Sequence, residues 1–158
     1  MKLRVLFTIV LLALSAFAAD RWLSPDKFYS ITPPADWKAS ESKGEASSSY
    51  AFTSTDGKAE IRISAAYHLQ LPPVLPDEVL ALAFPKERGI APIQKIRGEG
   101  WDGLRREYTD SDESTRWLGI AARRNSTAVL LTMKAPAKDF ERYRSTFEAV
   151  GKSLKLGE

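Results

Sequence analysis

The sequence contains no cysteine, a single histidine and no glycine-rich phosphate loop. Without cysteine the chain cannot form a disulfide, a thiolate nucleophile, an iron–sulfur cluster, a cysteine zinc site or a lipid-modified N-terminal cysteine. The one histidine, His68, is the only possible imidazole base, and a metal site around it would need carboxylates as its other ligands. No G-x-S-x-G motif accompanies it. We therefore predict a protein that is not an enzyme and binds no cofactor or metal.

The composition is that of a folding globular protein. Apolar residues make up 44% of the 158 residues and charged residues 27%. This balance excludes disorder over the whole chain and a multi-span membrane protein, and the length suits one domain.

The N-terminus has the pattern of a secretory signal peptide. Lys2 and Arg4 precede an apolar run from Val5 to Ala16, and Ala16-Phe17-Ala18 has the small residues of a cleavage site. The run is shorter than the roughly 20 residues of a membrane-spanning helix, and no stop-transfer segment follows it. We predict a signal peptide over residues 1–18, one mature domain over 19–158, and export to the periplasm or the extracellular space.

Removal of the signal peptide also removes most of the net positive charge. Residues 1–18 include two of the 23 Lys and Arg side chains, so the 140 residues that remain carry 21 basic and 20 acidic groups. A nearly neutral, exported chain offers no electrostatic attraction for nucleic acid.

Alternating apolar residues predict a series of short strands in the mature chain. A first strand is expected at 28–31, before Pro33 and Pro34, and a hairpin at 49–54 and 59–67 turns at Asp56-Gly57. Residues 38–48 lack apolar periodicity and are expected to form a flexible loop. An antiparallel meander is expected from four further segments, at 93–98, 104–109, 116–124 and 127–134.

Two segments have helical patterns. Asp77 and Glu78 open a helix that is expected to run to Phe84 and to end or kink at Pro85. Apolar residues at spacings of three and four predict a closing amphipathic helix, namely Phe140, Tyr143, Phe147, Val150 and Leu154. The order of elements predicts an α+β fold, an antiparallel sheet with helices packed on its faces.

Three segments in this order resemble the PsbP/Mog1/DcrB-like fold superfamily. They are the opening FYSITPPADWK, the middle GEGWDGLRREYTD with the hairpin RWLGIAARRNSTAVLLTMKAP, and the closing FERYRSTFEAVGKSLKL. The resemblance spans residues 26–156 and implies an α/β/α sandwich in a group whose members mostly bind or assist larger assemblies. None of the three segments is a catalytic motif, and fold alone does not fix function.

The segment Asp110 to Ser114 has oxygen-bearing side chains at alternate positions, as in the first half of a calcium loop. Thr115 stands where such a loop has glycine, however, and Ala121 where it has glutamate. A solvated hairpin tip is therefore the preferred interpretation, with a weak cation site as the alternative.

A cationic and aromatic cluster on the meander is the one candidate binding surface. Neighbouring strands could bring its members together to hold a protein or an anion through arginine and tryptophan. In the alternative interpretation the tryptophans are core residues and the arginines are solvated or paired with Glu107 and Asp110. The cluster consists of Trp101, Arg105, Arg106, Trp117, Arg123 and Arg124.

Three functions remain open at this point. The favoured one is a non-catalytic binding or accessory domain of the bacterial cell envelope with a protein partner. The alternatives are a periplasmic carrier of a small molecule or ion, which requires an apolar pocket, and a carboxylate-based hydrolase, which requires two acids in one cleft.

We expect export to yield a mature protein that begins at Ala19, because Ala16 and Ala18 present the small side chains that signal cleavage requires. Ala18→Leu should accumulate the uncleaved 158-residue precursor, whereas Ala13→Leu, which only makes the apolar run more apolar, should be processed normally. Intact-mass spectrometry of the exported fraction checks both. A wild-type protein that retains residues 1–18 would contradict the prediction.

Overall fold

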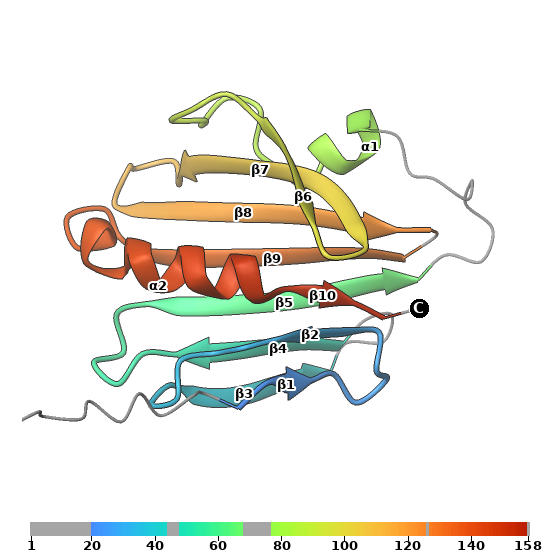
Figure 1. The fold of residues 1–158 in the computed structure, drawn as a ribbon. Coiled ribbons are helices and arrows are strands. Elements are labelled where there is room, and N and C mark those ends of the chain that lie inside the picture. The colour runs from blue at the N-terminus through green and yellow to red at the C-terminus, as the bar shows by residue number, and fades with distance from the viewer. Residues whose placement is uncertain (1–19, 44–47, 68–76, 126, 158) are drawn as a thin grey trace, which may run out of the picture.

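The computed structural model describes residues 20–43, 48–67, 77–125 and 127–157. The predicted signal peptide and His68 lie outside these residues. In the described part of the chain, the main element is an antiparallel sheet of seven strands in the order β3-β4-β5-β9-β8-β7-β6 (Figure 1). The strands are β3 (Lys38–Lys43), β4 (Ser48–Thr53), β5 (Glu60–Tyr67), β6 (Gln94–Gly98), β7 (Trp101–Thr109), β8 (Thr115–Arg124) and β9 (Thr127–Pro136).

The predicted meander and hairpin are confirmed. Strands β6, β7, β8 and β9 are consecutive antiparallel neighbours. The β4–β5 turn is made by Asp56 and Gly57, where Gly57 has φ +70° and donates its backbone N–H to Ser54 O at 2.8 Å. Glycine adopts this left-handed conformation without the steric cost of a side chain.

The prediction of a flexible loop over 38–48 is wrong for residues 38–43, which form the edge strand β3, and for Ser48, the first residue of β4. Its register pairs Ala39 with Phe52 and Glu41 with Tyr50 of β4. An edge strand exposed on both faces carries no apolar alternation, so its only strong signal is the backbone pairing itself. Residues 44–47 lie outside the described part of the chain.

Helix α2 (Phe140–Ser153) covers one face of the sheet across β8 and β9. The residues predicted from its spacing, Phe140, Tyr143, Phe147 and Val150, are all buried. On the central strand β9, alternate side chains face the helix, and this row is fully buried (Val129, Leu131 and Met133). Every second residue of the strand and every third or fourth residue of the helix thus pack together in one core.

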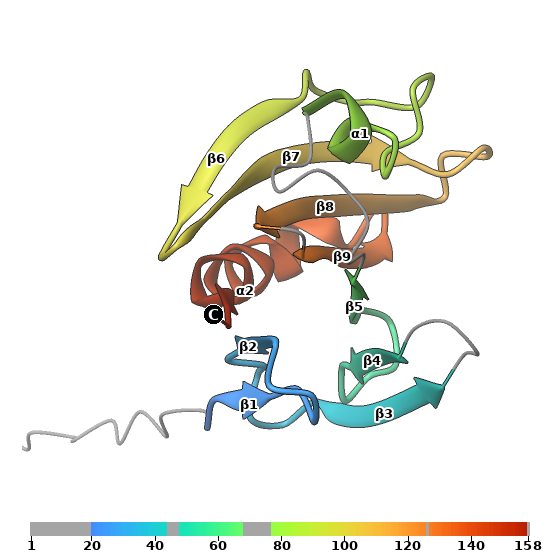
Figure 2. The ribbon, with the colours of Figure 1, turned by 90° about the vertical axis from the view of Figure 1, so that its right-hand side faces the viewer.

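A second, three-stranded sheet covers the rest of the same face. It comprises β1 (Trp22–Leu23), β2 (Tyr29–Ile31) and β10 (Lys155–Leu156), with β2 in the middle. The Trp22 ring lies 4.6 Å from that of Tyr50 on β4. Figure 2 shows the large sheet curling around α2, with β6 at one edge and β3 at the other.

The opposite face is covered at one end by the short helix α1 (Asp77–Ala81). It is shorter than the predicted 77–84, because the last residues make i→i−3 bonds such as Phe84 N to Ala81 O. Leu80 and Phe84 are buried against Leu104 and Tyr108 of β7. Helices thus pack on both faces of an antiparallel sheet, which confirms the α+β class. No described helix is long and apolar enough to cross a membrane.

Gly103 allows β7 and β8 to lie at their observed separation. A Cβ atom at this position would lie 2.2 Å from the backbone oxygen of Ala121. We expect Gly103→Ala to lower the free energy of unfolding by about 1–3 kcal/mol, because the Ala121 backbone that the new methyl group would contact cannot move without disturbing the sheet. Urea unfolding measures the change. Ser64→Ala on β5 is the control and should stay within about 0.5 kcal/mol of wild type; equal stability of the two variants would contradict this account.

A candidate binding cleft beside helix α2

The structure divides the six residues of the predicted cationic and aromatic cluster between the two faces of the sheet. Paired residues of neighbouring strands share a face, and alternate residues of one strand point to opposite faces. Three members lie on the α2 face and three on the α1 face, so they do not form one surface. The α2 face has Trp101, Arg105 and Arg124, and the α1 face has Arg106, Trp117 and Arg123.

On the α2 face these side chains hold the end of the chain in place. The Trp101 indole is 7% exposed, and its Nε1 donates to Leu154 O at 2.9 Å, just after the end of α2. Arg124 donates to Leu156 O at 3.1 Å. Trp101 is therefore a core residue, as the alternative interpretation had it, and both side chains satisfy carbonyls that follow the helix.

On the α1 face two of the arginines bind residues of α1 and of the segment that follows it. Arg106 donates to the carbonyls of Pro85 and Lys86 at 2.8 and 3.0 Å. Arg123 pairs with Asp77 of α1 at 3.0 Å and with Asp102 at 2.7 Å.

Trp117, the third member on this face, is stacked on Tyr108 with centroids 5.9 Å apart. The Lys134 ammonium lies 5.1 Å from its ring centroid. The six residues thus act mainly within the fold, and a role in partner binding stays a prediction.

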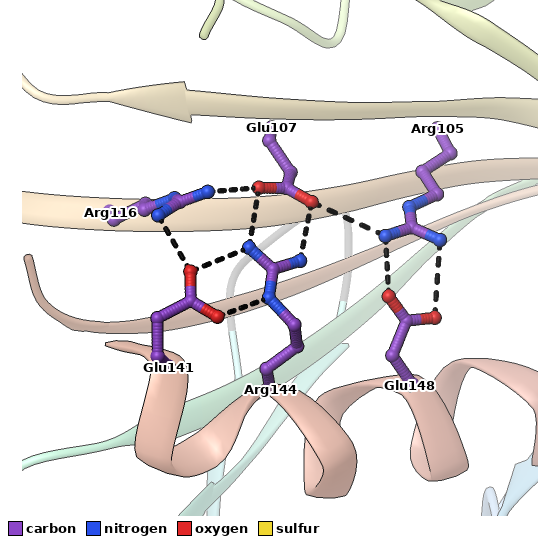
Figure 3. A network of polar contacts seen from close by, with 6 residues as sticks. All are labelled: Arg105, Glu107, Arg116, Glu141, Arg144 and Glu148. Carbon is purple, nitrogen blue, oxygen red and sulfur yellow. Dashed lines mark hydrogen bonds and ion pairs between the residues drawn. The ribbon is translucent and has the colours of Figure 1, made fainter. Parts of the chain in front are cut away.

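A network of charged side chains joins α2 to strands β7 and β8 (Figure 3). The Glu107 carboxylate accepts from Arg144 at 2.7 and 3.1 Å and from Arg116 at 2.7 Å. Glu141 binds the same two arginines, at 2.6–2.9 Å. Bidentate contacts of this kind fix the orientation of both partners. The network contains Arg105, Glu107, Arg116, Glu141, Arg144 and Glu148.

Glu107 is the central carboxylate of this network. Its side chain is 14% exposed. Hydrogen bonds from Arg144 and then Arg116 lower its pKa to about 2, against the opposing effect of burial. The carboxylates also raise the pKa of the Arg144 guanidinium. Glu107 and Arg144 are therefore both charged at neutral pH, and their ion pair links the helix to the sheet.

Beside this network lies a cleft of about 250 Å³ between the β6–β7 hairpin and the C-terminal half of α2. We call it the α2 cleft. Its apolar lining comes from Ile96, Trp101, Leu118, Ile120 and Phe147.

The rim of the α2 cleft is charged. Arg105 and Glu148 on the rim bind each other, with Arg105 Nη1 3.1 Å from Glu148 Oε2. Lys152 is exposed and makes no ion pair with any described residue. Arg97 also lines the cleft and makes no ion pair with any described residue. An apolar hollow with two uncompensated cations at its edge suits an apolar group that carries a negative charge nearby.

Gly151 allows helix α2 to lie close to the sheet at the α2 cleft, since a Cβ atom on this residue would lie 2.8 Å from Ile120 Cδ1. Three larger hollows of 390 to 510 Å³ are lined mainly by charged and polar residues. The α2 cleft differs from them in its apolar walls.

No cluster of metal-binding side chains is assembled in the described residues. They contain no group of three or more His, Asp or Glu placed to hold a metal ion. At the predicted hairpin tip the Asp110 carboxylate accepts from Thr115 N at 3.1 Å and Ser114 Oγ at 3.2 Å, and its pKa is lowered to about 2, chiefly by the Thr115 backbone bond. The tip is thus closed by its own hydrogen bonds.

Sequence reasoning did not find the α2 cleft or the role of Glu107 in the network, although part of the signal was present. Glu141, Arg144 and Glu148 recur at spacings of three and four on the predicted closing helix. Arg105 and Glu107 share one face of a predicted strand. Complementary charges on two amphipathic elements indicate facing surfaces.

No family model and no curated protein match the sequence. Solved structures are similar in fold. Cyanobacterial PsbP from Synechocystis superposes with a TM-score of 0.70 at 12% identity, over 90% of this chain and 95% of that one. LpqN of Mycobacterium tuberculosis, described as involved in cell envelope biogenesis, gives 0.52 at 10% identity, over 88% and 90%.

A protein from Bacteroides thetaiotaomicron gives a TM-score of 0.62 at 16% identity over 89% of this chain, which spans about half (49%) of that one. The chain therefore has a PsbP-like fold, and the resemblance seen in the sequence is confirmed for the fold. At these identities the likeness extends to the fold alone.

The network predicts a specific dependence of stability on pH. Because the pKa of Glu107 falls from an ordinary 4.5 to about 2 on folding, its contribution, about 2–3 kcal/mol, is fully present above pH 4.5 and is lost as the pH falls toward 2. Glu107→Gln should be destabilised at pH 7 and should differ much less from wild type at pH 2.5. Urea unfolding at both pH values measures this.

The control for this experiment is Glu87→Gln, an exposed carboxyl that makes no ion pair with any described residue. It should leave stability unchanged at both pH values. If Glu107→Gln lowers the free energy of unfolding equally at pH 7 and pH 2.5, the charge of Glu107 is not what stabilises the contact between α2 and the sheet.

Proposed function

We propose that the mature chain, residues 19–158, is a single exported domain of the bacterial cell envelope that acts by binding a protein partner and not by catalysis. The observation that carries the proposal is the α2 cleft. It is apolar, open to solvent and held on a scaffold that the Glu107 network makes rigid. A rigid site loses little conformational entropy when it binds.

The charges around the cleft support binding over catalysis. Glu148, the carboxylate on its rim, is engaged by Arg105. A carboxylate hydrolase needs two acids whose environments drive their pKa values apart within one cleft. The α2 cleft holds one acid, and that acid is neutralised by its partner.

The size of the cleft supports a protein partner over a carried small molecule. Pockets for drug-sized ligands measure about 300–1,000 Å³ and bury most of the ligand. At about 250 Å³, the α2 cleft accommodates one or two apolar side chains of a protein. Burial of such an anchor in a pocket is the usual centre of a protein interface.

The export pattern of residues 1–18 and the envelope role given for LpqN are consistent with this location. The PsbP-like fold adds the precedent that the sequence resemblance implied, of proteins that mostly bind or assist larger assemblies. The nearly neutral charge of the mature chain favours a partner other than nucleic acid.

Site-specific photocrosslinking in intact cells tests the proposal. A photoreactive phenylalanine analogue at Lys152, on the rim of the α2 cleft, should give one discrete crosslinked protein after purification of the mature chain. The same analogue at Ser145, exposed on the same helix two turns away, should give that product at a level at least several-fold lower, since its side chain lies outside the cleft.

Equal crosslinking at both positions, or none at either, would contradict the proposal. Mass spectrometry of a denatured extract of the purified protein distinguishes the carrier alternative, because a stoichiometric small molecule in place of a crosslinked protein would identify a carrier.

A further inference from the structure

Strand β6 is one edge of the large sheet. It pairs with β7 on one side only. No described residue forms a backbone hydrogen bond to its other side. Its five residues are exposed except for Ile96, which is half-buried. Such an edge presents a row of free N–H and C=O groups to which another strand can add.

The two faces of β6 differ in character. Its register pairs Ile96 with Gly103, and Lys95 and Arg97 with Leu104 and Asp102. Ile96 therefore lies on the α2 face, where it lines the α2 cleft. The register places Lys95 and Arg97 on the opposite face, and Arg97, at the edge of the sheet, borders the α2 cleft as well.

Most charges at this edge are already paired. Lys95 binds Asp77 at 2.6 Å, and Asp77 and Asp102 both bind Arg123 as well. Glu78 also lies close enough to act on Lys95. Arg97, in contrast, makes no ion pair with any described residue, and Lys95 is largely exposed to solvent. An acidic group beside β6 would compensate the charge of Arg97.

A second copy of this chain does not suit the edge. An antiparallel pair of β6 strands centred on Ile96 would place Lys95 of each copy opposite Arg97 of the other, and like charges directly opposite are unfavourable. This juxtaposition of like charges disfavours self-association through β6.

We propose that β6 binds an extended acidic segment of a partner protein by strand addition. In this arrangement an apolar residue of the segment lies beside Ile96 at the α2 cleft, near Lys152, and acidic residues on either side of it lie beside Lys95 and Arg97. The inference rests on the proposed function and names the chemistry of the partner: a segment of alternating acidic and apolar residues.

A synthetic peptide tests the pattern directly. The probe is the fluorescein-labelled peptide Thr-Val-Glu-Leu-Glu-Val-Thr, added to the purified mature protein, with affinity measured by fluorescence anisotropy and location by hydrogen exchange. It should bind and protect backbone amides of residues 94–98. The same peptide with Lys in place of both Glu residues should bind about tenfold more weakly.

A matched pair of backbone-modified peptides isolates strand addition from simple charge attraction. One carries N-methyl groups on the two Glu residues, and the other on Leu and the second Val. In an extended chain these methyl groups lie on opposite edges. Only the peptide with methyl groups toward β6 should lose affinity, by about tenfold or more. Equal affinity of the two would overturn the proposal.

Charge reversal on the protein provides the complementary test. Arg97→Glu should weaken binding of the acidic peptide about threefold to tenfold and strengthen binding of the lysine peptide. Lys138→Glu makes the same change of charge at an exposed site away from β6 and should leave both affinities unchanged. Equal effects of the two variants would overturn the proposal.

The experiments distinguish a failure of strand addition at β6 from a failure of the proposed function. Absence of protection at residues 94–98 with millimolar peptide would overturn strand addition, yet the Lys152 crosslink would still report whether a partner occupies the α2 cleft. Loss of the crosslink in cells together with peptide binding at β6 in solution would overturn the proposed function alone.

Discussion

The partly buried charge of Glu107 is the interaction on which the arrangement of helix and sheet depends. Moving a carboxylate out of water is costly unless it is paired and hydrogen-bonded, and Glu107 meets that requirement through Arg144 of the helix and Arg116 of the sheet. Burial of Phe147 and Val150 holds α2 against the strands, but apolar contact is not directional. The directional hydrogen bonds of the guanidinium groups fix the position of the helix along its axis and its rotation about that axis. They thereby also fix the width of the α2 cleft.

This constraint explains why a chain of ordinary composition presents a defined hollow. Gly151 brings the helix close to Ile120, while the hairpin of β6 and β7 curls over it from the other side (Figure 2). Arg105 on the rim is paired with Glu148, so Lys152 and Arg97 are the cations of the rim without an ion pair among the described residues. The α2 cleft and the Glu107 network are thus neighbouring parts of one interface between α2 and the sheet.

The sequence was sufficient for elements whose side chains alternate between a buried and an exposed face. The meander, the β4–β5 hairpin and the faces of Arg105 and Arg106 followed from that pattern. Strand β3 and the two-residue strands β1 and β10 did not, because backbone pairing defines them. The predicted arginine and tryptophan surface divided between two faces because a period of two separates Arg105 from Arg106. The α2 cleft needs the distance between helix and hairpin, which no local pattern encodes.

The small sheet has a consequence for the order in which the molecule can be completed. Its middle strand, β2, lies near the start of the described residues, whereas its partner β10 ends at Leu156. The pairing of β2 with β10 therefore cannot form until residues 155–156 have been synthesised, and Trp101 meets its acceptor at Leu154 only then. The strands of the large sheet are all synthesised earlier, so the small sheet is the last of the described parts of the fold that can close.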